Sequence, residues 1–303
     1  MNTGNRVKPA RSTRLVLALL LLSVLSGCSS AGYYWQSVQG QWQIMRAARP
    51  IPEWLDEAQT PPSLRQRLAL AQRMRAFAVS ELHLPDNPSY HRYADLQRRA
   101  VVWNVVAAPP LALTLKTWCF PVAGCVGYRG YFHEAEARAQ AAALQADGLE
   151  VNVYGVPAYS TLGWLNWAGG DPLLNTFIHY PEGELARLLF HELAHQVVYV
   201  QDDTMFNESF ATAVERLGGA AWLAQQGSDA ARQEYAVFDG RRRAFRTLAL
   251  EARQELTAIY AAHQTQQIDE PAAASQKAAA MARLRARYAE LRNTWGGYPG
   301  YDA

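Results

Sequence analysis

The sequence predicts an α+β protein that is mostly helical, with a small mixed sheet and a C-terminal helical hairpin. Apolar residues recur at helical spacing through several long segments, whereas runs rich in β-branched and aromatic residues are few and short. Beyond Gly219 the pattern is helical almost throughout, with segments at 229–263 and 272–295 joined by a polar loop. Few strands kept apart from many helices are typical of the α+β class.

The N-terminal half is predicted to contain helices and strands in roughly equal number. Proline clusters beginning at Pro50 and Pro85 end the first two helices, and Pro109 stops the first strand. A later strand alternates apolar and polar side chains and follows an Ala-rich helix. The helices are expected at 33–46, 63–82 and 133–146, and the strands at 101–107, 149–154 and 175–180.

The motif HELAH at 191–195 lies in a helix that the apolar spacing predicts for 185–200. His191 and His195 are four residues apart and therefore share one face of that helix, so both imidazoles can bind one ion. Glu192 can then accept a proton from a water molecule at the ion. This is the HExxH signature of zinc metallopeptidases, with two ligands and a general base.

A third protein ligand is expected, because catalytic zinc usually has three of them and one open position. The candidate is Glu208, which twelve residues separate from His195. A turn at 201–204, with Thr204 as N-cap, would begin a second helix that ends before Gly218. Antiparallel packing of the two helices at about 8–10 Å then places Glu208 level with the histidines. Alternatively, Glu208 is only a first-turn acid that stabilises the helix dipole.

These motifs resemble those of the gluzincin metallopeptidases, in which a glutamate on the helix after HExxH is the third zinc ligand. Here HELAHQ at 191–196 is followed by NESFA at 207–211. Other segments are similar to a family of bacterial lipoproteins described as predicted zinc aminopeptidases. These segments are WCFP at 118–121, GCVGYRGYF at 124–132, GVPAYSTLGW at 155–164 and DPLLNT at 171–176.

The resemblance implies a gluzincin-like fold with the sheet beside the HExxH helix, and an aminopeptidase with one Zn²⁺ ion per chain. His191, His195 and Glu208 would bind the ion, and Glu192 would act as the general base. Two features differ from the better-studied gluzincin aminopeptidases: the third ligand follows more closely, and no Gly-x-Met-Glu-Asn motif is present. The resemblance therefore supports the peptidase class more directly than exopeptidase specificity.

Substrate or oxyanion contacts are expected from side chains near the zinc. In gluzincins an edge strand beside the metal binds extended substrate by strand addition, and 154–159 or 175–180 could serve here. For each candidate residue, a packing or surface role is the alternative. The first candidates are Tyr154, Tyr159 and His179, and other possible donors are Tyr128, Arg129, Tyr235 and His263.

The N-terminus resembles a lipoprotein signal peptide that covers residues 1–27. Four basic residues precede an apolar run at 15–25 that is too short for an ordinary membrane span. The run leads into LSGC at 25–28, which resembles a bacterial lipobox with the lipid attached to Cys28. Ser29 after the cysteine favours the outer membrane of the cell envelope, facing the periplasm. A plain signal peptide or a signal anchor is the alternative.

The charge balance argues against nucleic-acid binding. The chain has 29 basic and 27 acidic residues. Residues 1–27 hold four of the basic residues and none of the acidic ones, so the remainder has 25 basic and 27 acidic residues, a net charge of −2. The expected partners are a peptide substrate and the membrane, through Cys28.

Two further cysteines, Cys119 and Cys125, are expected to form a disulfide. Export would place them in a compartment that permits disulfides. The five residues between them include Pro121 and Gly124 and can close a small loop. Two buried free thiols are the alternative.

The mature chain is expected to be one compact unit. Within it, 28–110 would be mainly helical, 111–220 would hold the zinc site and 221–303 would be helical. Because the similar lipoproteins continue further, the resemblance implies that the C-terminus is truncated.

Two other functions are open: a non-catalytic envelope lipoprotein with a structural metal or a peptide- or glycan-binding cleft, and a zinc amidase that acts on cell-wall peptides.

Overall fold

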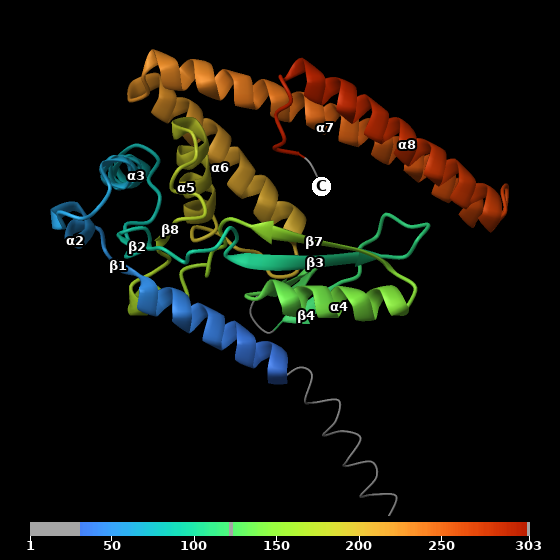
Figure 1. Ribbon diagram of the computed structural model, residues 1–303, viewed down its shortest axis with the longest axis horizontal. Helices are drawn as coiled ribbons and strands as arrows, with labels where there is room; N and C mark the ends of the chain where they lie inside the picture. Colours follow the sequence, from blue (N-terminus) through green and yellow to red (C-terminus); the bar gives the residue numbers. More distant parts are fainter. Residues whose placement is uncertain (1–30, 121–123, 302–303) are drawn as a thin grey trace, which may run out of the picture. The chain divides into compact units, whose positions relative to one another are not determined.

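The computed structural model describes residues 31–120 and 124–301, and the chain divides into compact units at 1–46 and 47–303 (Figure 1). In the first unit the described residues, 31–46, are all helical, which confirms the helix predicted for 33–46. The second unit combines many helices with three small sheets, which confirms the α+β class. Cys28 and the predicted signal peptide lie outside the described residues. None of the described helices is long and apolar enough to cross a membrane.

The strands are short and form three separate sheets. Their bounds are β1 Arg49–Pro50, β2 Arg92–Ala94, β3 Val102–Ala108, β4 Trp118–Phe120, β5 Gly124–Val126, β6 Arg129–Tyr131, β7 Glu150–Val156 and β8 Leu173–Leu174. The strand orders are β1-β2-β8, β6-β3-β7 and β4-β5, and only the β2–β8 pair is parallel. In the described part of the chain, β7 is therefore an edge strand.

Two of the three predicted strands are confirmed, as β3 and β7, which pair over seven residues from Val102 to Ala108. The strand predicted for 175–180 is wrong. Pairing with β2 ends at Leu174, and the next residues form turns in which the Tyr180 N–H donates to the Phe177 carbonyl (2.9 Å). The side chain of Asn175 holds the turn by accepting from the Leu96 N–H at 2.8 Å. Local hydrogen bonds thus replace the ladder that the apolar pattern favoured.

The helices of the second unit are mostly where the apolar spacing places them. Their bounds are α2 Ile51–Asp56, α3 Pro62–Ser80, α4 Glu134–Ala146, α5 Glu182–Ala194, α6 Thr204–Gln225, α7 Asp229–Gln264 and α8 Glu270–Thr294, with a 3₁₀ turn at Asn166–Ala168. The predicted C-terminal hairpin is confirmed as α7 and α8, which lie side by side (Figure 1).

Helices α5 and α6 pack closely, and their ends differ from the prediction. Helix α5 ends at Ala194 rather than Val200, and α6 does not stop before Gly218 but continues to Gln225. The reason is packing: a Cβ at Gly218 would lie 3.0 Å from the ring of Phe190. The glycine pair is therefore a point of close contact between the two helices and not a C-cap.

An aromatic cluster joins α3, α5 and α6. The ring centroid of Phe77 lies 6.1 Å from that of Phe190 and 5.4 Å from that of Trp222. Trp222 is 1% exposed, and its indole N–H donates to Glu182 at 2.9 Å. This core holds the HELAH helix rigidly at the centre of the unit.

The far end of the hairpin is attached to the sheet of β3 and β7. Ile259 and Tyr260 of α7 form an apolar cluster with α8, and Leu111, in the segment after β3, packs against it. Lys277 of α8 bonds both the carbonyl of Pro110 and the carboxylate of Glu150, at the start of β7. The hairpin is therefore fastened to the unit at this end as well as along α5.

Candidate metal centre and active site

Helix α5 presents His191 and His195 at its C-terminal end. His191 lies in the last turn, and His195 follows the last helical residue with φ −60° and ψ −20°. Its N–H still donates to the His191 carbonyl, so the early end of α5 does not separate the pair. The two Nε2 atoms are 3.1 Å apart.

Helix α6 brings Glu208 to the same point. Its Oε2 lies 3.4 Å from Nε2 of His191, and its Oε1 lies 3.7 Å from Nε2 of His195. Within the described residues, His191, His195 and Glu208 form a cluster whose ligand atoms all lie within 4.8 Å of one another. The structure thus brings together the three residues that the sequence predicts as ligands.

The loop before α6 fixes the position of Glu208. Asp203, and not Thr204 as predicted, is the N-cap, because its carboxylate accepts from the Phe206 N–H at 2.9 Å. The amide of Asn207 accepts from the N–H of Val200 at 2.8 Å and donates to the carbonyl of Val200 at 2.7 Å. Asn207 is 2% exposed, so these two hydrogen bonds fix the first turn of α6 and with it the position of the next residue, Glu208.

The ligand atoms have the spacing that a tetrahedral zinc site requires. Bonds of about 2.0–2.1 Å at tetrahedral angles separate ligand atoms by about 3.3 Å. The two nitrogens are 3.1 Å apart, and the nearest oxygens of Glu208 are Oε2, at 3.4 Å from His191, and Oε1, at 3.7 Å from His195, so both carboxylate oxygens lie close to this spacing. The imidazole and carboxylate donors are also those that zinc accepts. The residues present therefore fit the metal that the motif implies.

The electrostatics of the site favour a cation. Burial lowers the pKa of His191, but its hydrogen bonds to Glu208 and Glu215 and the charge of Glu192 together raise that pKa to about 10. Burial lowers the pKa of His195, and the charge of His191 lowers it further. The acidic side chains around the two imidazoles thus favour positive charge on His191, beside the position that a metal ion would occupy.

Glu192 has the properties of a general base. Burial raises its pKa to about 7; the charge of His191 opposes this rise, and the carboxylates of Asp171, Glu208 and Glu215 add to it. A carboxylate of this kind can both accept and release a proton near neutral pH. Glu192 and His191 also line a cavity of about 300 Å³, whose other lining residues include Glu215 but neither His195 nor Glu208.

Glu215 is a candidate functional residue that the sequence patterns did not single out. Its Oε2 lies 3.0 Å from Nδ1 of His191. A donor hydrogen bond from Nδ1 leaves Nε2 of the same ring free to bind a metal, and such carboxylate partners are usual behind metal-binding histidines. The signal is present in the sequence: Glu215 follows Glu208 by seven residues, two turns of the same helix, and therefore shares its face.

The tyrosine candidates have different surroundings. Tyr154 lies on the edge strand β7 and is 41% exposed. Tyr128 is also 41% exposed, but partial burial raises its pKa to about 12, and the charge of Glu208 raises that pKa further. Tyr159 packs edge-on against Phe132 at 6.0 Å, and burial raises its pKa. Tyr128 is therefore a better-placed contact beside the ligands than Tyr159.

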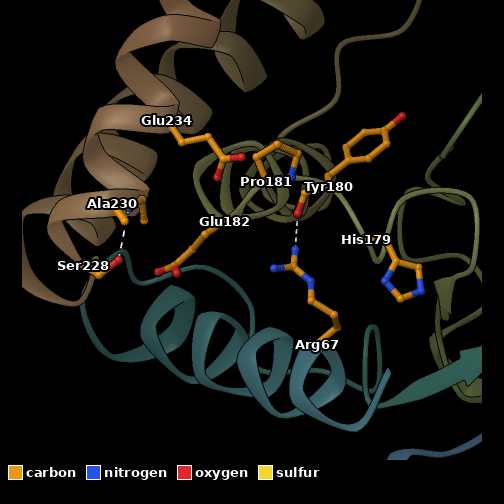
Figure 2. A pocket seen from close by; sticks show the side chains of 9 residues that line it. Arg67, His179, Tyr180, Pro181, Glu182, Ser228, Ala230 and Glu234 are labelled. Atoms are coloured by element: carbon orange, nitrogen blue, oxygen red, sulfur yellow. Dashed lines mark hydrogen bonds between the residues drawn. The ribbon is translucent and has the colours of Figure 1, made fainter. Parts of the chain in front are cut away.

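His179 lies in a different pocket, of about 600 Å³, at the start of α5 (Figure 2). Its neighbours include Arg67, whose guanidinium donates to the carbonyls of Ile178 (2.8 Å) and Tyr180. None of the residues described around this pocket belongs to the HELAH motif or is Glu208. The structure thus does not bring His179 to the metal centre.

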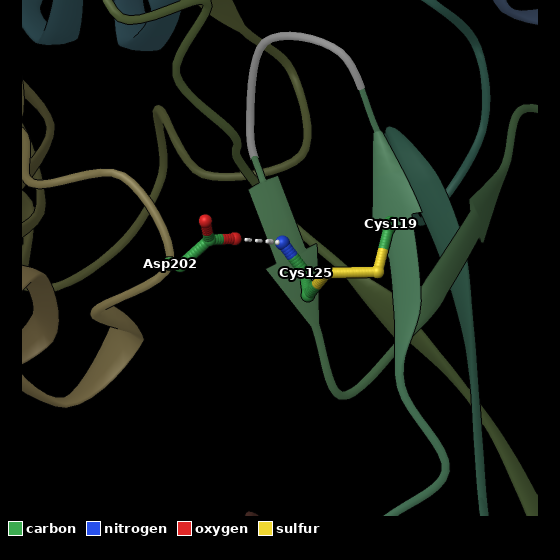
Figure 3. The surroundings of a disulfide bond; sticks show 3 residues. All are labelled: Cys119, Cys125 and Asp202. Atoms are coloured by element: carbon green, nitrogen blue, oxygen red, sulfur yellow. Dashed lines mark hydrogen bonds between the residues drawn. A yellow bond between two sulfur atoms is a disulfide. The ribbon is translucent and has the colours of Figure 1, made fainter.

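The predicted disulfide between Cys119 and Cys125 is confirmed, and it closes the β4–β5 hairpin (Figure 3). Asp202, within the turn predicted for 201–204, has φ +65° and accepts from the Cys125 N–H at 2.7 Å. The loop between His195 and Glu208 is thereby attached to the hairpin.

Neither the curated proteins nor the solved structures gave a match to this chain. A protein-family comparison did, over nearly all the described residues and including the complete ligand set. Residues 32–303 match the family described as "Putative aminopeptidase", and the chain therefore belongs to this aminopeptidase family.

Proposed function

We propose that the protein is a zinc metallopeptidase that hydrolyses peptide bonds and acts as an aminopeptidase. The observation that carries the proposal is the convergence of His191, His195 and Glu208 within 4.8 Å, beside the glutamate of the same motif. Family membership supports a peptide as the substrate.

The chain's own residues divide the work as follows. His191, His195 and Glu208 would hold the ion, and Glu215 would keep the Nδ1 proton of His191 in place. Zinc, when bound, supplies Lewis acidity for a water molecule and for the substrate carbonyl. Glu192 accepts the proton that the attacking water loses and returns it to the departing amine, so the amide bond is exchanged for one acid and one amine.

Strand β7 is the surface on which we place the substrate backbone. Strand β7 pairs with β3 along one of its two edges. In the described part of the fold, the N–H and carbonyl groups of its other edge are available to an extended peptide. Tyr154 lies on this strand, and Tyr128, near Glu208, could donate to the developing oxyanion.

The decisive experiment compares wild-type protein with Glu192→Gln after zinc loading. Aminoacyl anilides, internally quenched peptides and muropeptides are offered separately. Turnover of anilides or peptides that falls at least about 100-fold in Glu192→Gln, with zinc retained, supports the proposal. Turnover of muropeptides alone indicates a cell-wall amidase, and binding without turnover indicates a non-catalytic lipoprotein.

We further propose that the protein is anchored in the cell envelope by lipid on Cys28, in the outer membrane and facing the periplasm. The support is the signal-peptide pattern and the LSGC segment. Mass spectrometry of the mature N-terminus tests this directly. An acylated Cys28 is expected, and Cys28→Ser should abolish acylation; an unmodified N-terminus at another position would contradict the anchor.

A further inference from the structure

A continuous series of ion pairs leads from His191 to the C-terminal hairpin. Glu215 of α6, the partner of His191, also pairs with Arg187 of α5. Nη1 of Arg187 lies 3.9 Å from the carboxylate of Glu184 on the same helix. Glu184 in turn pairs with Arg242 of α7. The series therefore crosses three helices.

Helix α7 contacts this series at two points on one face. Tyr235 and Arg242 are seven residues apart, so they lie two turns apart on the same side of α7. The guanidinium carbon of Arg187 lies 6.0 Å from the centre of the Tyr235 ring, and Arg242 holds Glu184. The hairpin thus contacts Arg187, the partner of Glu215, and Glu184, the next residue in the series.

The series is largely shielded from solvent. Arg187 is 7% exposed, and the side chains of Glu215 and Glu184 are 15% and 20% exposed. Ion pairs in such surroundings are screened much less than surface pairs, so displacing one charge displaces its partner. The adjacent Arg243 provides a contrast, because it pairs with Asp239 at 3.3 Å but is 72% exposed.

We propose that Arg187 and Arg242 are positioning residues, which hold the Glu215 carboxylate so that His191 keeps the orientation of a metal ligand. The C-terminal hairpin, remote from HELAH in sequence, is then part of the metal centre. The inference rests on the proposed function for the identity of this centre, but it is tested by metal affinity and not by turnover.

The test measures the zinc dissociation constant of the full chain by competition with a chelator. Glu215→Gln is expected to weaken binding about 10–100-fold. Arg187→Met and Arg242→Met should weaken it about 2–30-fold, with Arg187→Met the larger effect and partial recovery in Arg187→Lys. Arg243→Met is the matched control for Arg242→Met, because it removes a positive charge from the neighbouring position of α7. It should leave the zinc dissociation constant unchanged.

A double-mutant cycle separates positioning from a general loss of stability. If Arg187 acts through Glu215, then adding Arg187→Met to Glu215→Gln should change the zinc constant little further. Two results would overturn the inference. One is that Arg187→Met raises the zinc dissociation constant by the same factor in wild-type protein and in Glu215→Gln. The other is that Arg242→Met binds zinc as tightly as Arg243→Met. Arg242 is 24% exposed, so its variant should still fold if Arg187→Met does not. Wild-type protein that binds zinc but cleaves no peptide contradicts only the proposed function, whereas wild-type protein without zinc affinity contradicts both.

Discussion

The carboxylate of Asp202 accepts a hydrogen bond from the backbone N–H of Cys125, at 2.7 Å (Figure 3). This bond attaches the loop between His195 and Glu208, two of the candidate ligands, to the disulfide hairpin. Gly124, beside the cysteine, has φ +71°, and a Cβ at that position would collide with Asp202. The hairpin and the ligand loop therefore fit together only with glycine at this point.

Gly124→Ala is expected to lower the free energy of unfolding by about 2–4 kcal/mol, because it adds a collision to the strain of a left-handed backbone. Gly148→Ala is the matched control: φ is +82° there, but nothing lies within 4 Å of the added Cβ. It should show only the backbone strain, about 1–2 kcal/mol. Urea unfolding measures both values, and equal losses would mean that the Asp202 contact contributes nothing.

Removing the disulfide by Cys119→Ser with Cys125→Ser should lower the free energy of unfolding by about 2 kcal/mol, as expected for a loop of this size. The zinc dissociation constant should also rise, because the loop between His195 and Glu208 is then attached to a hairpin without its disulfide. Thermal unfolding and chelator competition measure the two effects. A variant with lower stability but unchanged zinc affinity would show that the hairpin does not help to position Glu208.

Gly218→Ala should destabilise the protein by about 1–3 kcal/mol, since the new methyl group would overpack the contact with Phe190 and Leu82. Gly240→Ala, inside α7, has open space around its Cβ and should stabilise by about 0.5–1 kcal/mol through helix propensity alone. Opposite signs in chemical unfolding are the expected outcome. If Gly218→Ala is also stabilising, the two helices are not in close contact at this residue.

The α5–α6 pair shows which features of the fold the sequence patterns predict and which they do not. Helical spacing predicts both helices and places Glu208 opposite the histidines, because these depend on periodicity within a short stretch. The pattern does not find the end of α5 at Ala194, because Val197 and Val198 continue the apolar spacing although the backbone turns. It also interprets Gly218 as a stop signal, when the glycine serves a contact with residues far away in sequence. Tertiary packing decides both.

The missed Glu215 has a similar explanation. A glutamate on a helix is ordinary, and its importance comes from Arg187 and His191 on a neighbouring helix. Tyr128 could not be ranked among many aromatic residues until the β5–β6 connection placed it near Glu208. The ligand motif could be predicted because its residues are close in sequence; the partners behind it could not.

The stability of the protein should depend on pH through Asp171, which is 4% exposed and accepts from the Thr161 N–H at 3.0 Å. Burial raises its pKa, so the folded state binds the proton more tightly than the unfolded state. The free energy of unfolding therefore falls as pH rises from the unfolded pKa of about 4 through the higher folded pKa. Relative to wild type, Asp171→Asn should become steadily more stable over that interval. Urea unfolding of metal-free protein measures the free energy of unfolding of wild type and Asp171→Asn. If the difference between these two values does not change with pH, Asp171 is not the cause of the pH dependence.

Equilibrium dialysis with elemental analysis shows whether His191, His195 and Glu208 form one zinc site. Wild-type protein and Glu192→Gln should each bind about one zinc ion per chain, because the glutamate of the motif is not a ligand. Glu208→Ala should lose most of the metal while remaining folded. Zinc bound by Glu208→Ala as tightly as by wild type, or no zinc bound by wild type, would mean that these three residues do not form a zinc site.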